Sequence, residues 1–210
     1  MITEIEKHFP TQSRLSVKSG WMAIAGGILY NARWLWELSE GRVKHIIYPP
    51  TAATQYFFIV QLLFLVVLVS LYRNFREDRP VRTGTLVASV GLVWSSLVTL
   101  PEAWGIPGDW SLYSLPGLAA FVVGTLLAGV GLKKVPTAYP HGVMLLWIGV
   151  LRGLAVLASI LLFDQLGRGL AARQIASLAS NFLLLAEGMG WIYLGVYLLR
   201  GYKPLHRSDL

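Results

Sequence analysis

Long apolar runs separated by short polar segments dominate the pattern along this chain. A transmembrane helix needs roughly 20 consecutive, mostly apolar residues. Six runs approach or exceed this length, at residues 20–38, 51–72, 83–100, 112–132, 143–163 and 176–199. The first run is the least regular, because it contains Asn31, Arg33 and Glu37. The pattern predicts an all-α fold, a bundle of six transmembrane helices that forms one integral membrane domain over residues 1–210.

The distribution of basic residues predicts how the bundle is oriented. Lysine and arginine are enriched in cytoplasmic loops of membrane proteins. With six spans and a cytoplasmic N-terminus, the inner segments carry 12 basic residues and the outer segments 4. If residues 20–38 do not span, the counts become 9 and 8, which favours neither side. We therefore expect six spans, both termini in the cytoplasm, and a location in the cytoplasmic membrane of a prokaryote.

The two ends of the chain are expected to be cytoplasmic tails, residues 1–19 and 200–210. Ile2, Ile5 and Phe9 fall at helical spacing, so the N-terminal tail is either a short amphipathic helix on the membrane surface or a solvated segment.

The amino-acid composition excludes several kinds of functional site. Of the 210 residues, 55% are hydrophobic and 14% are charged, with a formal net charge of +7. The basic residues lie between the apolar runs, which favours topology signals over nucleic-acid binding. The chain has no cysteine, which excludes disulfides and thiolate nucleophiles. The histidines fall outside the spans, which argues against transmembrane haem ligation, and no HExxH or Walker A motif is present. We expect no catalytic residues, no metal and no cofactor.

Polar residues inside the spans predict a layer near the middle of the bundle. A charge at this depth is costly and usually faces a partner or a wet cavity. Counting about 1.5 Å per residue from the cytoplasmic end of each run places most of these residues about 13–20 Å deep, with Glu37 one turn beyond Arg33. The expected ligand-binding layer consists of Arg33, Gln61, Arg152, Glu187 and Trp191, with Glu37, Ser95 and Ser96 as secondary members.

Two pairings of the charged residues fit these depths. In the first, Arg152 pairs with Glu187, and Arg33 pairs with Glu37 four residues further along its own helix. In the second, Arg33 reaches Glu187 and leaves Arg152 for an anionic or polar ligand. Arginine suits either role, because its planar guanidinium bonds a carboxylate or phosphate through two nitrogens.

These features favour a non-enzymatic, transporter- or receptor-like membrane protein whose polar layer binds or conducts a small polar, anionic or lipid-like molecule. A purely structural Arg152–Glu187 pair is the competing interpretation of the layer. The alternative function is a small accessory subunit that packs against a membrane protein partner through small-residue helix faces. Such faces are expected at Ala120, Gly124 and Ala128, at Gly149 and Gly153, and at Ala186 and Gly190. A lipid-modifying enzyme is a third hypothesis.

The segment RNFREDRPVR, residues 73–82, is dense in charge. We interpret it first as a topology signal. The alternative is a dock for anionic lipid headgroups or for an acidic partner.

Overall fold

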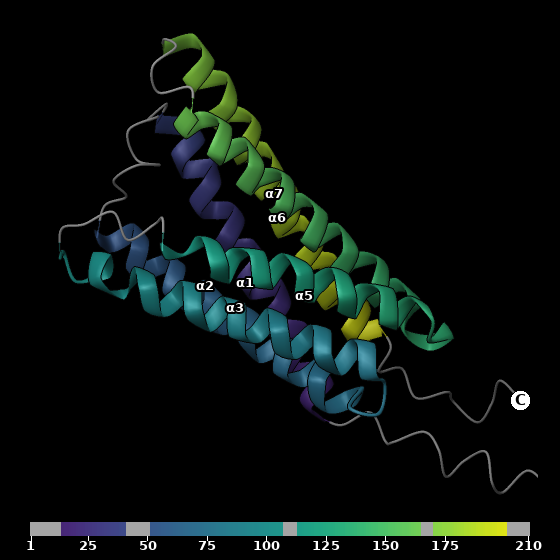
Figure 1. The fold of residues 1–210 in the computed structure, drawn as a ribbon. Helices are drawn as coiled ribbons and strands as arrows, with labels where there is room; N and C mark the ends of the chain where they lie inside the picture. The colour runs from purple at the N-terminus through teal and green to yellow at the C-terminus, as the bar shows by residue number, and fades with distance from the viewer. Residues whose placement is uncertain (1–13, 41–50, 107–112, 165–169, 201–210) are drawn as a thin grey trace, which may run out of the picture.

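The computed structural model describes residues 14–40, 51–106, 113–164 and 170–200 (Figure 1). Within these ranges the chain is entirely helical, with six α-helices, one short 3₁₀ helix and no strand. The elements are α1 (Arg14–Glu40), α2 (Thr51–Asn74), α3 (Arg79–Ala103), α5 (Leu115–Lys133), η3 (Pro136–Ala138), α6 (Tyr139–Asp164) and α7 (Leu170–Arg200). The all-helical prediction is confirmed for the described part of the chain.

Among the residues that the structure describes, five helices are long and apolar enough to cross a membrane. These segments are Gln55–Asn74, Arg79–Pro101, Leu115–Lys133, Pro136–Leu161 and Leu178–Arg200, and they correspond to the second to sixth predicted spans. α1 is helical over the whole first run, as predicted, but it is longer, with 27 residues from Arg14 to Glu40, so it includes residues 14–19 of the predicted tail. It is not among the five. Its polar positions, including Asn31 and Arg33, lower its hydropathy. The fold therefore fits a multi-pass membrane protein.

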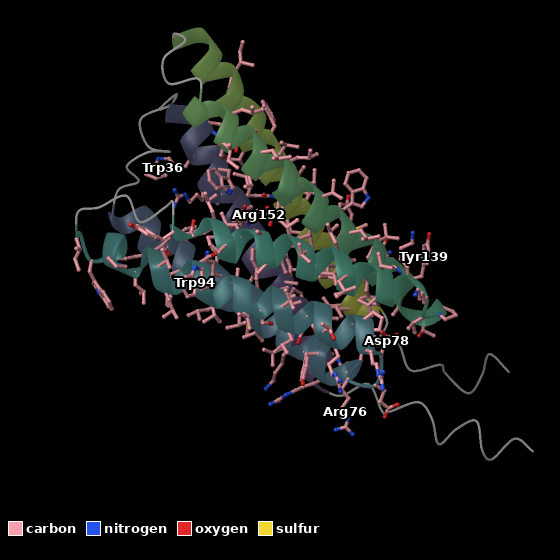
Figure 2. All side chains as sticks on the ribbon, in the orientation of Figure 1. Trp36, Arg76, Asp78, Trp94, Tyr139 and Arg152 are labelled. Atoms are coloured by element: carbon pink, nitrogen blue, oxygen red, sulfur yellow. The ribbon has the colours of Figure 1, made fainter. Side chains whose placement is uncertain are left out.

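The six α-helices in the described part of the chain form a closed ring. Each helix packs against the next one along the chain, and α7 packs against α1 to complete the circle. Neighbouring helices run antiparallel. In Figure 1, α2, α3 and α5 run at an angle to the α6–α7 pair, and the two groups converge where α5 leads into α6. α1 passes behind α5 in this view and packs against both α7 and α2. We name the two ends of the bundle after exposed residues labelled in Figure 2, the Arg76 end at the α2–α3 turn and the Trp36 end opposite.

Glycines bring several of these helices into close contact. A Cβ added to Gly124 on α5 would collide with the backbone nitrogen of Ala88 on α3. A Cβ added to Gly27 on α1 would lie 2.7 Å from the carbonyl oxygen of Gly188 on α7. Because lipid tails are as apolar as leucine, membrane helices associate through this kind of close packing.

The predicted small-residue faces are right in part. Gly124 and Ala128 on α5 are buried against α3, as expected. On α7 the prediction was wrong for Ala186, which is exposed, and right for Gly190, which is buried and whose added Cβ would lie 3.0 Å from Ile148 on α6. The α7 glycines that approach α1 are Gly188 and Gly195. Spacing of four residues identifies a face of a helix but not the neighbour that the face meets.

Candidate functional site

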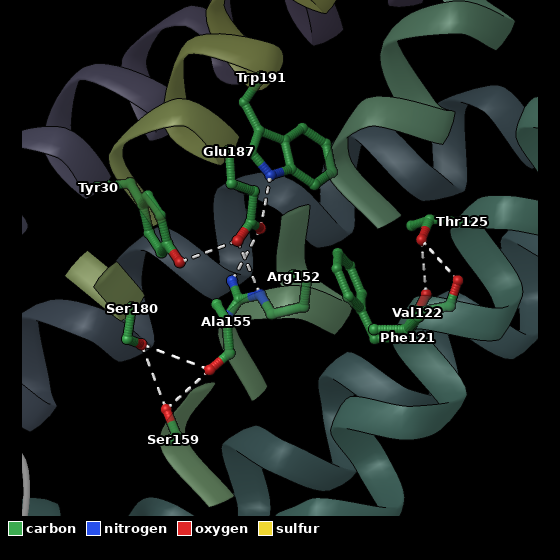
Figure 3. Close-up of polar contacts among 10 residues, drawn as sticks. All are labelled: Tyr30, Phe121, Val122, Thr125, Arg152, Ala155, Ser159, Ser180, Glu187 and Trp191. Carbon is green, nitrogen blue, oxygen red and sulfur yellow. Dashed lines mark hydrogen bonds and ion pairs between the residues drawn. The ribbon is translucent and has the colours of Figure 1, made fainter. Parts of the chain in front are cut away.

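The centre of the bundle holds an ion pair between Arg152 on α6 and Glu187 on α7 (Figure 3). Nη2 of Arg152 donates a hydrogen bond of 2.9 Å to Oε1 of Glu187. Nε of Arg152 lies 2.8 Å from Oε2, which is an ion-pair contact without hydrogen-bond geometry. The side chains are 10% and 0% exposed, respectively. The structure therefore shows the first of the two pairings for Glu187.

Two further groups surround the carboxylate of Glu187. The hydroxyl of Tyr30 on α1 donates to Oε2 at 3.1 Å. Nε1 of Trp191, one turn along α7, lies 3.5 Å from Oε1, a long hydrogen bond. The guanidinium carbon of Arg152 is 5.4 Å from the ring centre of Tyr30 and 5.7 Å from that of Phe121. The carboxylate thus joins three helices, α1, α6 and α7, and aromatic faces cover its partner.

Tyr30 is a site residue that the sequence reasoning missed. It is fully buried and touches both members of the ion pair. A signal was available, because Tyr30 lies ten residues into the first apolar run, which is about 15 Å deep at 1.5 Å per residue. This depth falls within the predicted polar layer, and a buried tyrosine hydroxyl usually finds a hydrogen-bond partner.

A cavity of about 410 Å³ adjoins the ion pair on the side toward the Trp36 end. Its size lies within the usual range of small-molecule sites, roughly 300–1,000 Å³. Most of its wall is apolar. All six α-helices contribute to the lining, which consists of Trp34, Phe57, Gln61, Ser95, Thr99, Ser114, Leu115, Leu118, Arg152, Ala155, Val156, Ser159, Ile160 and Leu184.

Hydroxyl and amide groups form a polar strip on this wall. Ser96, behind the wall, donates a hydrogen bond of 2.6 Å to Oε1 of Gln61 and so orients the amide. Ser95 is 3% exposed, and its Oγ has no hydrogen-bond partner among the described atoms. Ser159 lies 3.3 Å from Ser180, whose Oγ also contacts the carbonyl of Ala155 at 3.4 Å (Figure 3). A buried hydroxyl without a hydrogen-bond partner is unfavourable, and a polar group of a bound ligand could supply the missing hydrogen bond to Ser95.

The predicted layer is therefore distributed between the ion pair and the cavity. Gln61, Ser95 and Arg152 line the cavity, while Glu187 and Trp191 lie behind Arg152. Arg33 is not part of the lining. Its guanidinium carbon lies 5.4 Å from the ring centre of Trp34 and 5.8 Å from that of Phe57, two aromatic residues of the cavity wall. The side chain of Glu37 lies outside the described residues, so the predicted Arg33–Glu37 pair does too.

Trp191 also packs against other aromatic side chains, besides its contact with Glu187. Its ring stacks on Phe64, with centroids 4.0 Å apart and an interplanar angle of 9°. Phe121 lies 6.4 Å from the same ring. All three side chains are buried. They form an aromatic cluster, Phe64, Phe121 and Trp191, next to the ion pair.

The chain has no match among protein-family models, curated proteins or solved structures. Among the described residues, no three histidine, aspartate or glutamate side chains gather as metal ligands would. A functional interpretation must therefore come from the ion pair and the cavity beside it.

Proposed function

We propose that this protein is an integral membrane protein that binds a small, uncharged amphipathic molecule in the cavity beside Arg152. The observation that carries the proposal is a cavity of about 410 Å³ with an apolar wall and a polar strip, at the level of a buried ion pair. The polar head of the ligand would face Gln61, Ser95 and Arg152. Its apolar body would lie against side chains such as Leu118, Ile160 and Leu184.

The charge of the site favours an uncharged ligand over an anion. An anion would have suited the second predicted pairing, in which Arg33 reaches Glu187 and leaves Arg152 free. Arg152 is the one ionisable residue in the described lining, and Glu187 already neutralises it. A bound anion would have to compete with this carboxylate or carry an uncompensated charge into the bundle. Burying an unpaired charge is strongly unfavourable. A hydroxyl or carbonyl group can instead hydrogen-bond to Ser95 or Gln61 without changing the charge.

The same geometry supports binding more than conduction. Glu187 and the aromatic cluster fill the bundle beside the cavity on the side toward the Arg76 end. These side chains are at most 2% exposed, so the ligand would stop at Arg152 in this arrangement. Conduction would require the cluster to move.

An accessory-subunit role has less support than it had from the sequence. The glycines that motivated it, such as Gly124, contact neighbouring helices of this same chain. These glycines are therefore not free to receive a partner.

We further propose that α1 is the sixth span and that both termini are cytoplasmic, in the cytoplasmic membrane of a prokaryote. α1 packs against α7 from Gly20, whose added Cβ would lie 2.8 Å from Leu199, to Gly27. Trp34, further along α1, lines the cavity. From Gly20 to Trp34 the helix rises about 21 Å, which is most of the apolar core of a bilayer.

Photo-crosslinking tests the proposed ligand. Three probes share a 12-carbon chain that carries a diazirine and differ in their head: an alcohol, a carboxylate and an ammonium. We expect the alcohol probe to label peptides of α3 and α6 most strongly. Val156→Phe, which fills the cavity, should reduce this labelling, and the control Leu154→Phe should not, because Leu154 is 46% exposed on the outer face.

Two results would contradict the proposal. Equal labelling of wild type and Val156→Phe would show that the probe binds elsewhere. Preferential labelling by the carboxylate probe would show that the ligand is an anion. Both variants should keep the thermal unfolding midpoint of the wild type within a few degrees, which separates loss of binding from loss of fold.

A further inference from the structure

A second concave site lies at the Arg76 end, far from the cavity beside Arg152 (Figure 2). We call it the arginine hollow. It has a volume of about 830 Å³ and is lined by Tyr72, Arg73, Arg76, Glu77, Arg79 and Arg82. These residues come from the end of α2, the α2–α3 turn and the first turn of α3.

The backbone of this turn is held in place by hydrogen bonds. The N–H of Phe75 donates to Leu71 at 3.0 Å, and the N–H of Asp78 donates to Phe75 at 3.1 Å. The carboxylate of Asp78 accepts a hydrogen bond of 3.0 Å from the N–H of Val81. Asp78 therefore caps the start of α3, and the turn presents the neighbouring arginines from a fixed backbone.

The hollow carries an uncompensated positive charge. Four guanidinium groups and the carboxylate of Glu77 leave its lining with a net charge of +3. In the described part of the chain, none of the four arginines forms an ion pair.

The start of α3 faces the same hollow, and the carboxylate of Asp78 satisfies one of its free N–H groups. Arg79 and Arg82 lie in its first turn, which has no acidic residue. Cations are disfavoured at the positive end of a helix dipole, and a bound anion there is stabilised.

Apolar surface continues directly from the hollow along both helices. On α3, Leu86 and Val90 follow Arg82 at intervals of four residues and are 52% and 59% exposed. On α2, Val69 lies four residues before Arg73 and is 40% exposed. Residues four apart lie on the same face of a helix. A molecule with an anionic head and long apolar chains would match both the arginine hollow and this apolar surface. Free phosphate would contact the arginine hollow alone.

We propose that the arginine hollow binds the headgroup of an anionic phospholipid, whose acyl chains lie along the exposed faces of α2 and α3. Arginines fit this role because the guanidinium fork bonds phosphate oxygens through two nitrogens. Basic pockets at the membrane surface are a recognised means of binding anionic lipid heads. This site is independent of the ligand proposed for the cavity beside Arg152.

Lipid titration of the full-length protein in detergent, followed by native mass spectrometry, tests this inference. The probes are phosphatidylglycerol and phosphatidylcholine with identical acyl chains, and inorganic phosphate as a competitor. The test variant is the double substitution Arg76→Gln and Arg79→Gln. The matched control is Lys133→Gln with Lys134→Gln, which removes the same charge from exposed residues outside the hollow.

We expect the wild type and the lysine control to prefer phosphatidylglycerol over phosphatidylcholine. The arginine variant should bind phosphatidylglycerol about 25-fold more weakly, at roughly fivefold for each guanidinium lost. Inorganic phosphate at the lipid concentration should not displace the lipid. If both double variants lose the same affinity, the lipid responds only to the net charge of the protein. If inorganic phosphate displaces the lipid, the hollow is a site for small inorganic anions. Either result would overturn the proposal.

Discussion

The hydroxyl of Tyr30 lies 3.1 Å from Oε2 of Glu187, although 157 residues separate the two in the sequence. The hydrogen bond joins α1 to α7 and so closes the ring of helices in the buried interior. Both side chains are 0% exposed. The less apolar first helix is therefore held in the bundle by a polar contact as well as by its glycines.

Tyr30→Phe removes this hydrogen bond and keeps the ring that covers Arg152. We expect a loss of about 1 kcal/mol in the free energy of unfolding, because hydrogen bonds between membrane helices contribute about 0.6–2 kcal/mol. Titration of the purified protein with sodium dodecyl sulfate would measure it. Tyr193→Phe is the control, since Tyr193 is 52% exposed on α7, and it should change stability by less than about 0.5 kcal/mol. A loss of equal size in the two variants would contradict the role given to Tyr30.

The Arg152–Glu187 pair predicts strong coupling between its two members. Arg152→Leu or Glu187→Leu alone leaves one buried charge without its partner, which typically destabilises a protein by about 3–5 kcal/mol. The double variant leaves no charge, so its free energy of unfolding should fall by much less than the sum of the two single effects. A double-mutant cycle in detergent measures this coupling. Additive effects would show that the two charges do not stabilise each other.

Substitution by alanine should have different effects at Gly124, in the α3–α5 contact, and at Gly153, in the α5–α6 contact. Gly124→Ala places a methyl group against the backbone of Ala88, so α3 and α5 must separate and the protein should be destabilised. Gly153→Ala adds a methyl group that would lie 3.5 Å from Val122, an ordinary contact. Alanine exceeds glycine in helix propensity by about 1 kcal/mol, so Gly153→Ala should be neutral or stabilising. Thermal unfolding in detergent compares the two, and equal midpoints would contradict this packing.

The sequence predicts how deep a polar residue lies in the bundle better than it predicts the direction in which its side chain points. Because a helix rises by a nearly constant amount per residue, counting placed Gln61, Arg152 and Glu187 at one level, and the structure brings them together there. The direction in which a side chain points depends on which neighbouring helix packs where. This is why Ala186 proved to be exposed and why Arg33 lies behind the cavity wall. The cavity was not predictable, because its shape depends on side-chain volumes from all six α-helices.

The absence of cysteine makes the orientation directly testable, because every introduced thiol is the single one in the chain. If α1 crosses the membrane, Lys18→Cys should behave like Arg76→Cys, and Trp36→Cys like Trp104→Cys. Positive charge around Arg76 predicts that the first pair is cytoplasmic and resists a membrane-impermeant maleimide applied to intact cells. The second pair should react. If α1 instead lies on one side of the membrane, Lys18→Cys and Trp36→Cys will react alike. That outcome would show that α1 does not cross the membrane, and the proposed sixth span would be wrong even if α1 still packs against α7 and α2.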